Sequence, residues 1–494
     1  MSSSTYYKPP VRFTLPVGSE ATVENIYKAV QELESRKARY EQLHDYYIGN
    51  QAVLNRTLSS ETAKNNKLVN NFASYIADIS ANYLLGNPVD YLVPDDAGIN
   101  IDSILTRYSE QGMSDEDAGL ALDAAIYGVA YDLTFTDEDS QPNTVQIDPR
   151  NTLMVYDDSV QHRELFAINC AQVKSKEGKT INRITAYTDS EIIDLTIDAE
   201  GNELKAPKAT PHYFGAVPVV EYPNNKSYLG SFEPVLSLID AYNTIQSDRV
   251  NEREELADAI LVLKNFTLDE KRQANLRDLR LLTSVPADGD ASYLTKPQSE
   301  SDADILKQSL ADDIHKFSKT PNLSDQNFVG NSSGVALNYK LLAFEEEAKT
   351  HERFIEKGLK KRMKLYFNLE NHLKQGAGGK TAKEIARIDV VFNRNLPKND
   401  YETSQMIVNL QGIVKDDYLV KQLSFVDNAE KAMVEEEPDE FPEQYPETTE
   451  EDIQADIEAK LAEAEENDAE AQAEKFAAEN DTKTWNPNTN QYEE

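Results

Sequence analysis

Cysteine is almost absent from this sequence. Among 494 residues Cys170 stands alone, and there is also only one tryptophan. A single cysteine cannot close a disulfide within the chain, and it cannot supply the clustered thiolates of a Cys-based zinc site. The sequence therefore excludes a disulfide-stapled scaffold and fits synthesis in a reducing, intracellular place.

Positive charge is scarce as well. The chain has 50 Lys and Arg residues against 87 Asp and Glu residues, which gives a net charge of −37. Proteins that grip nucleic acid neutralise its phosphates with clustered lysines and arginines. So acidic a chain excludes tight, salt-dependent DNA binding, although it leaves contact with DNA open.

Long apolar runs are also missing. No uncharged stretch of about 18 apolar residues occurs anywhere, and residues 1–16 are polar, without an apolar segment of signal-peptide length. We therefore predict a protein that is neither secreted by that route nor membrane-spanning. The 39% hydrophobic content is still enough for a sizeable core, and at about 150 residues per domain the length suggests roughly three folded units.

Helical and strand-like patterns follow one another in the first half of the chain. Apolar residues at helical spacing predict helices over 22–47, 68–85 and 114–127. Short apolar and β-branched runs predict strands over 89–93, 129–135, 144–147, 153–156, 165–173, 181–187, 192–197 and 217–222. This mixture predicts an α+β body.

The middle of the chain predicts long helices. Residues 229–266 show helical spacing throughout and would span about 57 Å as one helix. Residues 248–258 are mostly charged with few apolar anchors, so we expect this half to pack against another chain. Helices are also predicted over 304–318 and 335–373, with a turn-rich polar stretch between them.

Charge gathers in two places. A basic cluster on the last of these helices consists of Lys357, Lys360, Lys361, Arg362 and Lys364. Ion pairing with the acidic surplus of this or a neighbouring chain is the favoured interpretation, and a DNA or partner contact is the alternative. Residues 429–494 hold 23 acidic and 4 basic residues, a net charge of −19. They form either a solvating tail or, over 450–480, a helix that orders on assembly.

Motifs for catalysis are weak. Residues 330–334 match the G-x-S-x-G turn of hydrolases, but no predicted strand precedes them, so a polar loop with a helix cap near Ser332 is favoured. Residues 374–381 do not form a phosphate-binding loop, because Lys374 stands where the motif needs its first glycine. A connection from a helix to a strand over 388–392 is favoured instead. The six histidines are scattered. We predict no catalytic residue, no metal site and no cofactor.

A series of segments occurs in a characteristic order: Lys67-Leu-Val-Asn-Asn-Phe72 through Leu85-Gly-Asn-Pro-Val89, Ile147-Asp-Pro149, Val217-Pro-Val-Val-Glu-Tyr222 with Asn224-Asn225, Ile239-Asp-Ala-Tyr-Asn243, Phe328-Val-Gly-Asn-Ser-Ser-Gly-Val-Ala-Leu-Asn-Tyr-Lys-Leu341, Gln411-Gly-Ile-Val-Lys415 and Leu423-Ser-Phe-Val-Asp-Asn428. In this order they resemble the portal proteins of tailed double-stranded DNA bacteriophages, the head-to-tail connectors of siphophage type. The likeness covers about residues 25–440 and rests on the order of the segments.

The resemblance implies an α+β portal-type fold and a ring of about a dozen subunits around a DNA channel at one capsid vertex. In its terms the chain divides into an N-terminal arm (1–25), the wing (26–228), stem helix 1 (229–264), the clip, a small α/β unit (265–303), stem helix 2 (304–319), the tunnel loop (320–334), a long wing helix and strand (335–398), a helical crown (399–479) and a loose acidic tail (480–494).

The resemblance also implies which residues face DNA. Those on the stem helices are Asp248, Arg249, Glu252, Glu255, Lys307 and Asp312. Those in the tunnel loop are Asn322, Ser324, Asp325, Gln326, Asn327, Phe328, Asn331 and Ser332. An acidic wall repels phosphate, and a loop of uncharged polar residues attracts it little, so the composition fits a conduit through which DNA slides.

The partners that the resemblance implies are further copies of the chain, viral double-stranded DNA, the packaging terminase, a head-completion or adaptor protein, and the major capsid and scaffolding proteins, with no membrane. The protein would assemble in the bacterial host cytoplasm and reside in the virion at the portal vertex. Motor activity would belong to the terminase, so the chain itself is predicted not to be an enzyme.

Two alternatives stay open. An intracellular structural scaffold without a DNA channel would form discrete dimers or open filaments instead of closed rings. A hydrolase built around Ser332 would lose its activity on Ser332→Ala, a substitution that leaves ring assembly intact in a portal protein.

Overall fold

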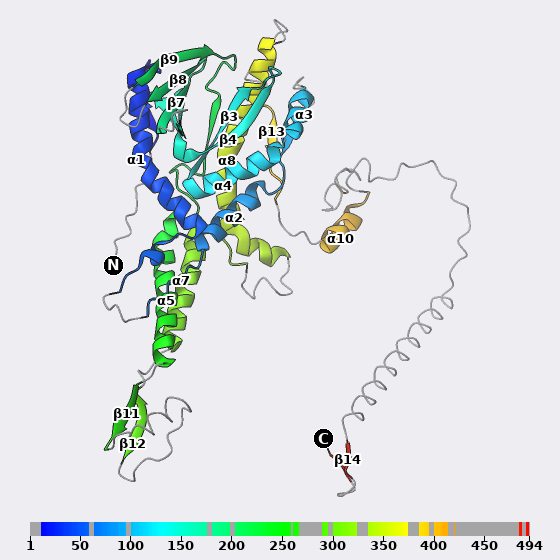
Figure 1. Ribbon diagram of the computed structural model, residues 1–494. Coiled ribbons are helices and arrows are strands. Elements are labelled where there is room, and N and C mark those ends of the chain that lie inside the picture. The colour runs from blue at the N-terminus through cyan, green and yellow to red at the C-terminus, as the bar shows by residue number, and fades with distance from the viewer. Residues whose placement is uncertain are drawn as a thin grey trace, which may run out of the picture. The chain divides into compact units, whose positions relative to one another are not determined.

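The computed structural model describes residues 11–58, 64–94, 100–174, 180–197, 203–257, 260–265, 289–294, 300–323, 334–373, 385–394, 400–412, 419, 484–486 and 491–493. Contacts between residues divide the chain into two units, Met1–Pro397 and Lys398–Glu494. In the first unit, helices pack on two main sheets, and a pair of helices extends away from them (Figure 1). No helix in the described part of the chain is long and apolar enough to cross a membrane.

The larger sheet has six strands, and the first half of helix α1 (Val23–Ile48) packs on it. Its strands lie in the order β1 (Phe13–Leu15), β5 (Thr152–Asp157), β6 (Glu164–Lys174), β7 (Thr180–Tyr187), β8 (Glu191–Ile197) and β9 (Glu203–Pro211). Only β1 and β5 run parallel; the other neighbours are antiparallel. Ile26 and Leu33 of α1 are buried against Val155, Phe166 and Ile184 of the sheet.

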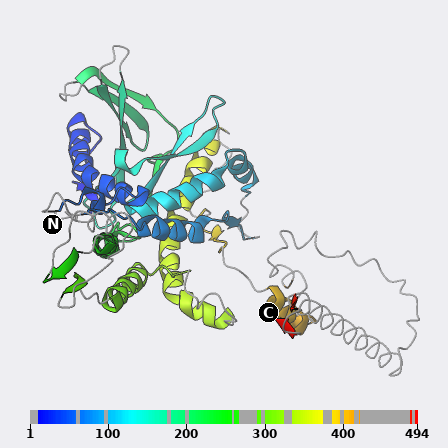
Figure 2. The ribbon, with the colours of Figure 1, turned by 60° about the horizontal axis from the view of Figure 1, so that its bottom comes forward.

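A three-stranded antiparallel sheet lies beside it, in the order β10 (Val219–Pro223), β3 (Val129–Thr136), β4 (Pro142–Ile147). Three helices pack around this sheet: α2 (Phe72–Leu85), α4 (Met113–Tyr127) and α8 (Gly334–Leu373). Leu84, Leu120, Val220 and Leu359 share one buried cluster there. Figures 1 and 2 show α4 and α8 beside these strands from two directions. We call the two sheets with α1, α2, α4 and α8 the body.

Most of the predicted elements of the body are confirmed. The helices expected over 22–47, 114–127 and 335–373 are α1, α4 and α8, and each strand predicted between 129 and 222 lies within or overlaps an observed strand. The sequence did not predict β1, β9 or helix α3 (Asp102–Glu110). Strand β9 is polar and contains two prolines, so it has no clear hydrophobic alternation. Helix α3 does bury one face, through Ile104 and Tyr108, but it is only nine residues long.

Helix α2 begins at Phe72, four residues later than predicted. The backbone N–H groups of Leu68 and Asn70 donate to side chains of another helix, at 3.0 and 2.8 Å, so these residues stay extended. Asn71 then caps the helix by accepting from the Ser74 N–H at 3.3 Å. After α2, β2 (Asp90–Leu92) pairs with β13 (Asp389–Val391).

The long helix predicted over 229–266 is shorter in the structure. A 3-10 turn, η4 (Glu233–Val235), leads into α5 (Leu236–Ala257), and the chain then forms strand β11 (Ile260–Lys264), antiparallel to β12 (Asp290–Leu294). The prediction was wrong at both ends. Spacing alone cannot show whether a short apolar run such as Ile260-Leu-Val-Leu263 forms a helix or a strand. Here β12 pairs with the run, so it is a strand.

Helix α7 (Glu300–Ser318) confirms the helix expected over 304–318 and begins four residues earlier. It packs along α5, and Figure 1 shows the two side by side, with β11 and β12 beyond their far end. We call α5 and α7 the helix pair.

The basic cluster of α8 is largely paired within its own chain. Lys360 lies 2.7 Å from Glu356 and Lys361 lies 2.5 Å from Glu164. Arg362 is fully buried, with ion pairs of 2.7 Å to Asp117 and 3.3 Å to Asp132. These contacts confirm the ion-pairing interpretation for three of the five residues.

In the second unit, helix α10 (Asp400–Leu410) falls in the segment expected to form the crown. Strands β14 (Thr484–Asn486) and β15 (Gln491–Glu493) pair antiparallel. The prediction of loose chain over 480–494 was therefore wrong for these six residues: Trp485 and Tyr492 are directly opposite each other, and large aromatic residues favour strands. The helix predicted over 450–480 lies outside the described residues.

Candidate functional site at the junction of the body and the helix pair

Segments that carry the family resemblance meet where the helix pair leaves the body. Asn224 and Asn225 open the loop that precedes α5, residues 239–243 lie in the first turns of α5, and residues 67–72 run beside that helix. Residues far apart in the sequence thus determine how α5 is attached to the body.

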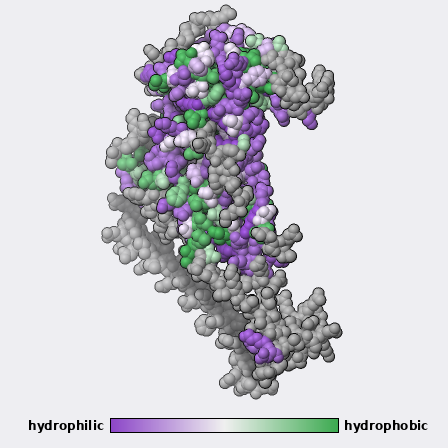
Figure 3. All heavy atoms as spheres, turned by 90° about the vertical axis from the view of Figure 1, so that its left-hand side faces the viewer, coloured by the Kyte–Doolittle hydropathy of each residue, from purple (hydrophilic) through white to green (hydrophobic). Residues whose placement is uncertain are grey.

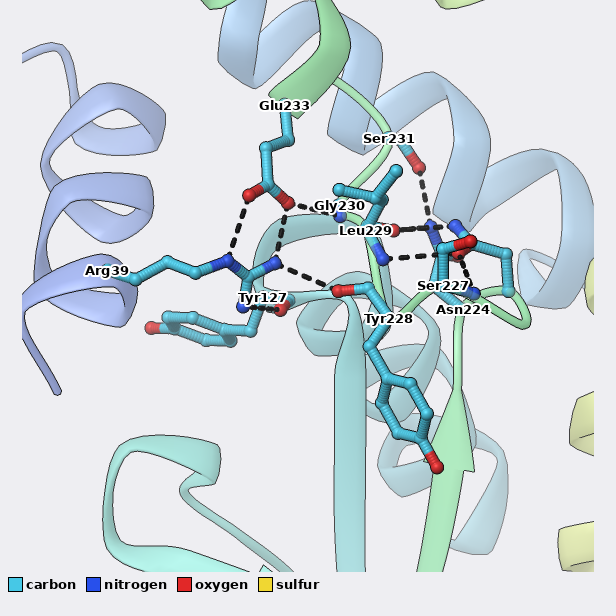
Figure 4. Close-up of polar contacts among 10 residues, drawn as sticks. Arg39, Tyr127, Asn224, Ser227, Tyr228, Leu229, Gly230, Ser231 and Glu233 are labelled. Atoms are coloured by element: carbon cyan, nitrogen blue, oxygen red, sulfur yellow. Dashed lines mark hydrogen bonds and ion pairs between the residues drawn. The ribbon is translucent and has the colours of Figure 1, made fainter. Parts of the chain in front are cut away.

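Arg39 of α1 is the central side chain of this junction (Figure 4). Its guanidinium forms a bidentate ion pair with Glu233, at 2.8 and 2.6 Å, and donates to the backbone carbonyls of Tyr127 at 3.2 Å and Tyr228 at 2.9 Å. Arg39 is only 3% exposed. Because a bidentate pair fixes direction as well as distance, Arg39 holds α1, the end of α4 and the start of α5 in one arrangement.

The loop before α5 is also fixed by its own asparagines. The Asn224 amide donates to the Leu229 carbonyl at 2.9 Å, and the Asn225 side chain accepts from the Leu229 N–H at 3.1 Å. The Gly230 N–H donates to the Glu233 carboxylate at 3.0 Å (Figure 4). The backbone of this loop is therefore satisfied locally before α5 begins.

Two glycines allow this loop to press against the turn between α4 and β3. A Cβ on Gly128 would collide with the carbonyl oxygen of Tyr228, and Gly128 has a positive φ of 84°. A Cβ on Gly230 would collide with the carbonyl oxygen of Ile126. Both positions therefore exclude any larger residue.

Beside α5 runs an extended segment that we call the strap, residues 64–71. Its N–H groups donate to three side chains of α5 that we call the ladder, Asn243, Ser247 and Asn251. The backbone contacts are Asn70 to Asn243 (2.8 Å), Leu68 to Ser247 (3.0 Å) and Asn66 to Asn251 (2.7 Å). The side-chain amides of Asn70 and Asn66 donate to the same two oxygens, at 3.2 and 3.0 Å.

The predicted stem residues all fall on the helix pair, but they have different surroundings. Asp248 pairs with Arg56 at 2.5 Å, and Arg249 faces α7, where it pairs with Asp304 at 2.7 Å. Glu252 and Asp312 are exposed, and Lys307 is half-buried. The side chain of Glu255 lies outside the described residues. This half of α5 therefore has partners in its own chain, which the sequence did not predict.

Of the predicted tunnel-loop residues, the structure describes only Asn322, because residues 324–333 lie outside the described ranges. The approach to that loop is well fixed. The Tyr75 hydroxyl donates to the Pro321 carbonyl at 3.0 Å and accepts from the Leu323 N–H at 3.1 Å. His315 of α7 lies edge-on to Tyr75, and its Nδ1 is 3.1 Å from the Thr320 carbonyl oxygen. The segment leaving α7 is thus bound to α2.

A buried histidine lies near the same end of α7. Lys319, the residue after α7, pairs with Glu347 of α8, and the Nε2 of His351 lies 3.7 Å from that carboxylate. Burial lowers the pKa of His351 to about 4, opposed by Glu347 and assisted by Lys319. His351 is therefore uncharged at neutral pH.

Two titratable groups with strongly shifted pKa values, Cys170 and Asp132, are poor candidates for catalysis. Burial raises the pKa of the Cys170 thiol to about 12, so it is a poor nucleophile. Burial also raises the pKa of Asp132 to about 6, but this carboxylate is enclosed in the body with Arg362 and Tyr222. Within the described ranges no group of His, Cys, Asp or Glu could hold a metal ion.

The surface of the helix pair is mixed in character. Figure 3 shows one face of the molecule, on which hydrophobic residues gather in small groups between hydrophilic ones. On α7 three large apolar side chains are exposed, Ile305 by 66%, Leu306 by 50% and Phe317 by 55%. Ile305 and Leu306 are adjacent in the sequence, whereas Phe317 lies near the other end of α7.

Sequence reasoning missed the ladder, although a signal for it exists. Asn243, Ser247 and Asn251 recur every four residues on a predicted helix, so they share one face. Three small polar residues on one face that flank apolar anchors indicate a helix that bonds another backbone. The strap itself has no such signal, because residues 68–71 also fit a helical period.

Comparisons with known proteins support the resemblance. A family model described as "Phage portal protein, SPP1 Gp6-like" matches residues 28–471. Among similar proteins, the portal protein of Bacillus phage SPP1 is 24% identical over 408 residues, which cover 78% of this chain and 78% of that protein. The portal protein of Clostridium phage phiCD119 is 23% identical over 428 residues, which cover 81% of this chain and 91% of that protein.

Proposed function

The chain belongs to the SPP1 Gp6-like family of phage portal proteins, and from this premise we propose that about a dozen copies close into a ring with the helix pair around its central channel. The ring occupies one vertex of the capsid. Viral double-stranded DNA enters through the channel during packaging and leaves through it during infection.

The observation that carries this proposal is the way the helix pair projects from the body. Helices α5 and α7 extend beyond the two sheets, and the hairpin β11–β12 lies past their far end (Figure 1). The exposed apolar residues of α7, Ile305, Leu306 and Phe317, supply contacts between neighbouring subunits. A rod that is attached at one end and carries exposed apolar residues suits the wall of a ring.

Charge on the helix pair supports a sliding contact with DNA. The exposed Glu252 and Asp312 repel phosphates, so they keep DNA from adhering to the wall. Arg249 is engaged with Asp304 and offers little attraction. Asp248, Lys307 and Glu255 complete the proposed lining.

The tunnel loop is the second DNA-facing part that we propose. Its residues are Asn322, Ser324, Asp325, Gln326, Asn327, Phe328, Asn331 and Ser332. The contacts of Tyr75 with Pro321 and Leu323 anchor its start on α2, so the loop begins from a fixed point of the body.

We assign partners to the remaining parts of the chain from the family to which it belongs. The clip, expected over 265–303, also includes β11, because β11 pairs with β12; it contacts the packaging terminase and later a head-completion or adaptor protein. The N-terminal arm spans 1–25, the wing spans 26–228 and 335–398, and the crown begins near residue 399. Major capsid and scaffolding proteins surround the ring in the virion, after its assembly in the host cytoplasm. The chain is a structural component without enzymatic activity.

Light scattering combined with negative-stain microscopy tests this proposal on the purified chain. We expect a closed ring with a central hole and a mass of about twelve or thirteen times the 55.6 kDa of one chain. A stable dimer or an open filament would favour a scaffold without a DNA channel. Ring assembly by the Ser332→Ala variant, equal to that of the native chain, would count against the hydrolase alternative.

A further inference from the structure

The strap and the ladder form a regular contact between an extended backbone and a helix. Five N–H groups of the strap, three from the backbone and two from side chains, converge on three oxygens of α5. We propose that this contact locks the rotation of α5 about its own axis. Asn243, Ser247 and Asn251 are then positioning residues for the face of α5 that borders DNA, an inference that rests on the proposed channel.

The spacing of the two partners explains why the contact is regular. From Asn243 to Asn251 α5 rises by about 12 Å, at 1.5 Å per residue. From Asn70 back to Asn66 an extended chain covers about 13 Å, at 3.3 Å per residue. Four helical residues therefore match two extended ones, and every second N–H of the strap meets one ladder oxygen.

The three ladder residues are buried, so their oxygens depend on the strap for hydrogen bonds. Asn243 and Ser247 are 0% exposed and Asn251 is 6% exposed. A turn of α5 by one residue, about 100°, would withdraw all three oxygens from the N–H groups of the strap and leave these buried acceptors without their donors. A buried polar group without its partner is strongly unfavourable, so each of the three contacts opposes such a turn.

Gln51 joins the contact between the strap and the ladder to the body. Its side-chain oxygen accepts from the Asn243 amide at 2.6 Å. Its own amide donates to the Tyr46 carbonyl at 3.1 Å and to Asn71 at 2.9 Å. Gln51 is fully buried. The end of α1, the strap and α5 are therefore joined through one amide.

The sides of α5 that the strap does not cover show what a rotation of α5 would change. Helix α7 covers another side, where Arg249 pairs with Asp304. Thr244 and Glu252 are exposed, and Asp248, which lies between them on the same side of α5, is paired with Arg56. Rotation of α5 would therefore exchange this open, acidic side for a covered one.

Thiol labelling of assembled rings tests the lock. Ser247→Cys places a thiol at a 0% exposed position, and it is combined with either Asn251→Asp or Asn251→Leu. Aspartate keeps the accepting oxygen, whereas leucine removes it at similar volume. We expect maleimide to label the thiol at position 247 at least tenfold faster in the Asn251→Leu background than in the Asn251→Asp background. The native Cys170 on β6 serves as an internal control for an intact body, since its labelling should be equal in both.

DNA packaging provides the second measurement, on single variants without the reporter thiol. We expect Asn251→Leu to assemble rings but to package DNA at least fivefold more slowly, and Asn251→Asp to restore most of the rate. Equal labelling at position 247 in the two variants, or equal packaging by them, would overturn the lock. If Asn251→Leu fails to assemble, Ser247→Ala takes its place, with the native chain as its control. Failure of the native chain to form rings would instead refute the proposed function.

Discussion

The body and its junction with the helix pair are stabilised by different combinations of contacts. The body closes around several clusters of buried apolar residues contributed by sheets and helices. The helix pair shares one of these clusters through Leu236, Ile239, Tyr242 and Ile314. Hydrogen bonds and ion pairs are added there, above all those of Arg39, Gln51, the strap and the ladder. Apolar burial resists unfolding but is not directional, whereas hydrogen bonds specify orientation. Apolar burial therefore stabilises both the body and the attachment of the helix pair, and the polar contacts of the junction specify the direction of the helix pair.

The largest expected effect on stability comes from Arg362, whose guanidinium is fully buried in the body between Asp117 and Asp132. Arg362→Ala leaves these two carboxylates buried without their cation, so it should lower the free energy of unfolding by about 3–5 kcal/mol. Urea denaturation measures this loss. Lys357→Ala, at an exposed position of the same helix, serves as the control. A loss below about 1 kcal/mol for Arg362→Ala would show that the buried pair is dispensable.

Apolar packing in the body gives the next effect. Leu359 is 0% exposed and lies in the cluster that joins α8 to the three-stranded sheet. Leu359→Ala should destabilise the protein by about 2–4 kcal/mol. Leu342, on the same helix but 53% exposed, is the matched control, and Leu342→Ala should cost less than about 0.5 kcal/mol. Equal effects would mean that the described cluster does not hold the body together.

Acid should weaken the contact between α7 and α8. His351 has a pKa of about 4 in the fold against about 6.5 when unfolded, so the unfolded chain binds an extra proton between these values. Stability is then fully present above pH 6.5 and falls as the pH drops towards 4, by about 2–3 kcal/mol. Thermal unfolding over this range should show a shallower fall for His351→Phe. An unchanged slope would contradict the assignment.

The smallest expected effect concerns the junction. Glu233→Gln keeps the shape of the side chain but removes the charge that faces Arg39, so it should destabilise the protein by about 1–2 kcal/mol. Its characteristic consequence is a change in the direction of the helix pair, which a distance between spin labels on β4 and α7 would detect. An unaltered distance distribution would show that other contacts at the junction are sufficient.

Prediction from the sequence succeeded where one periodicity dominates. Apolar spacing identified α1 and α8, which pack long apolar stripes on the sheets. Helix α4 was also predicted, although it is buried on several sides and contributes to two clusters. It failed where another segment decides the outcome: β11 is a strand because β12 pairs with it, and residues 68–71 leave a helical period because α5 accepts their N–H groups. The family resemblance pointed to the segments of the junction but not to their contacts.

The candidate site could be predicted from the sequence only where helical spacing placed its residues. Charged residues such as Asp248 and Glu252 could be placed on a helix from their spacing, but the pairing of Arg249 with Asp304 depends on α7, which lies far along the chain from α5. The tunnel-loop residues 324–333 stay a prediction, since they lie outside the described part of the chain.

A cryo-electron microscopy reconstruction of the assembled ring tests the central claim most directly. The account predicts a closed ring in which α5 and α7 border the central hole and the side of α5 that carries Thr244 and Glu252 faces the hole, with the strap on the side away from it. A ring with the helix pair on its outer surface, or with the strap towards the hole, would contradict it.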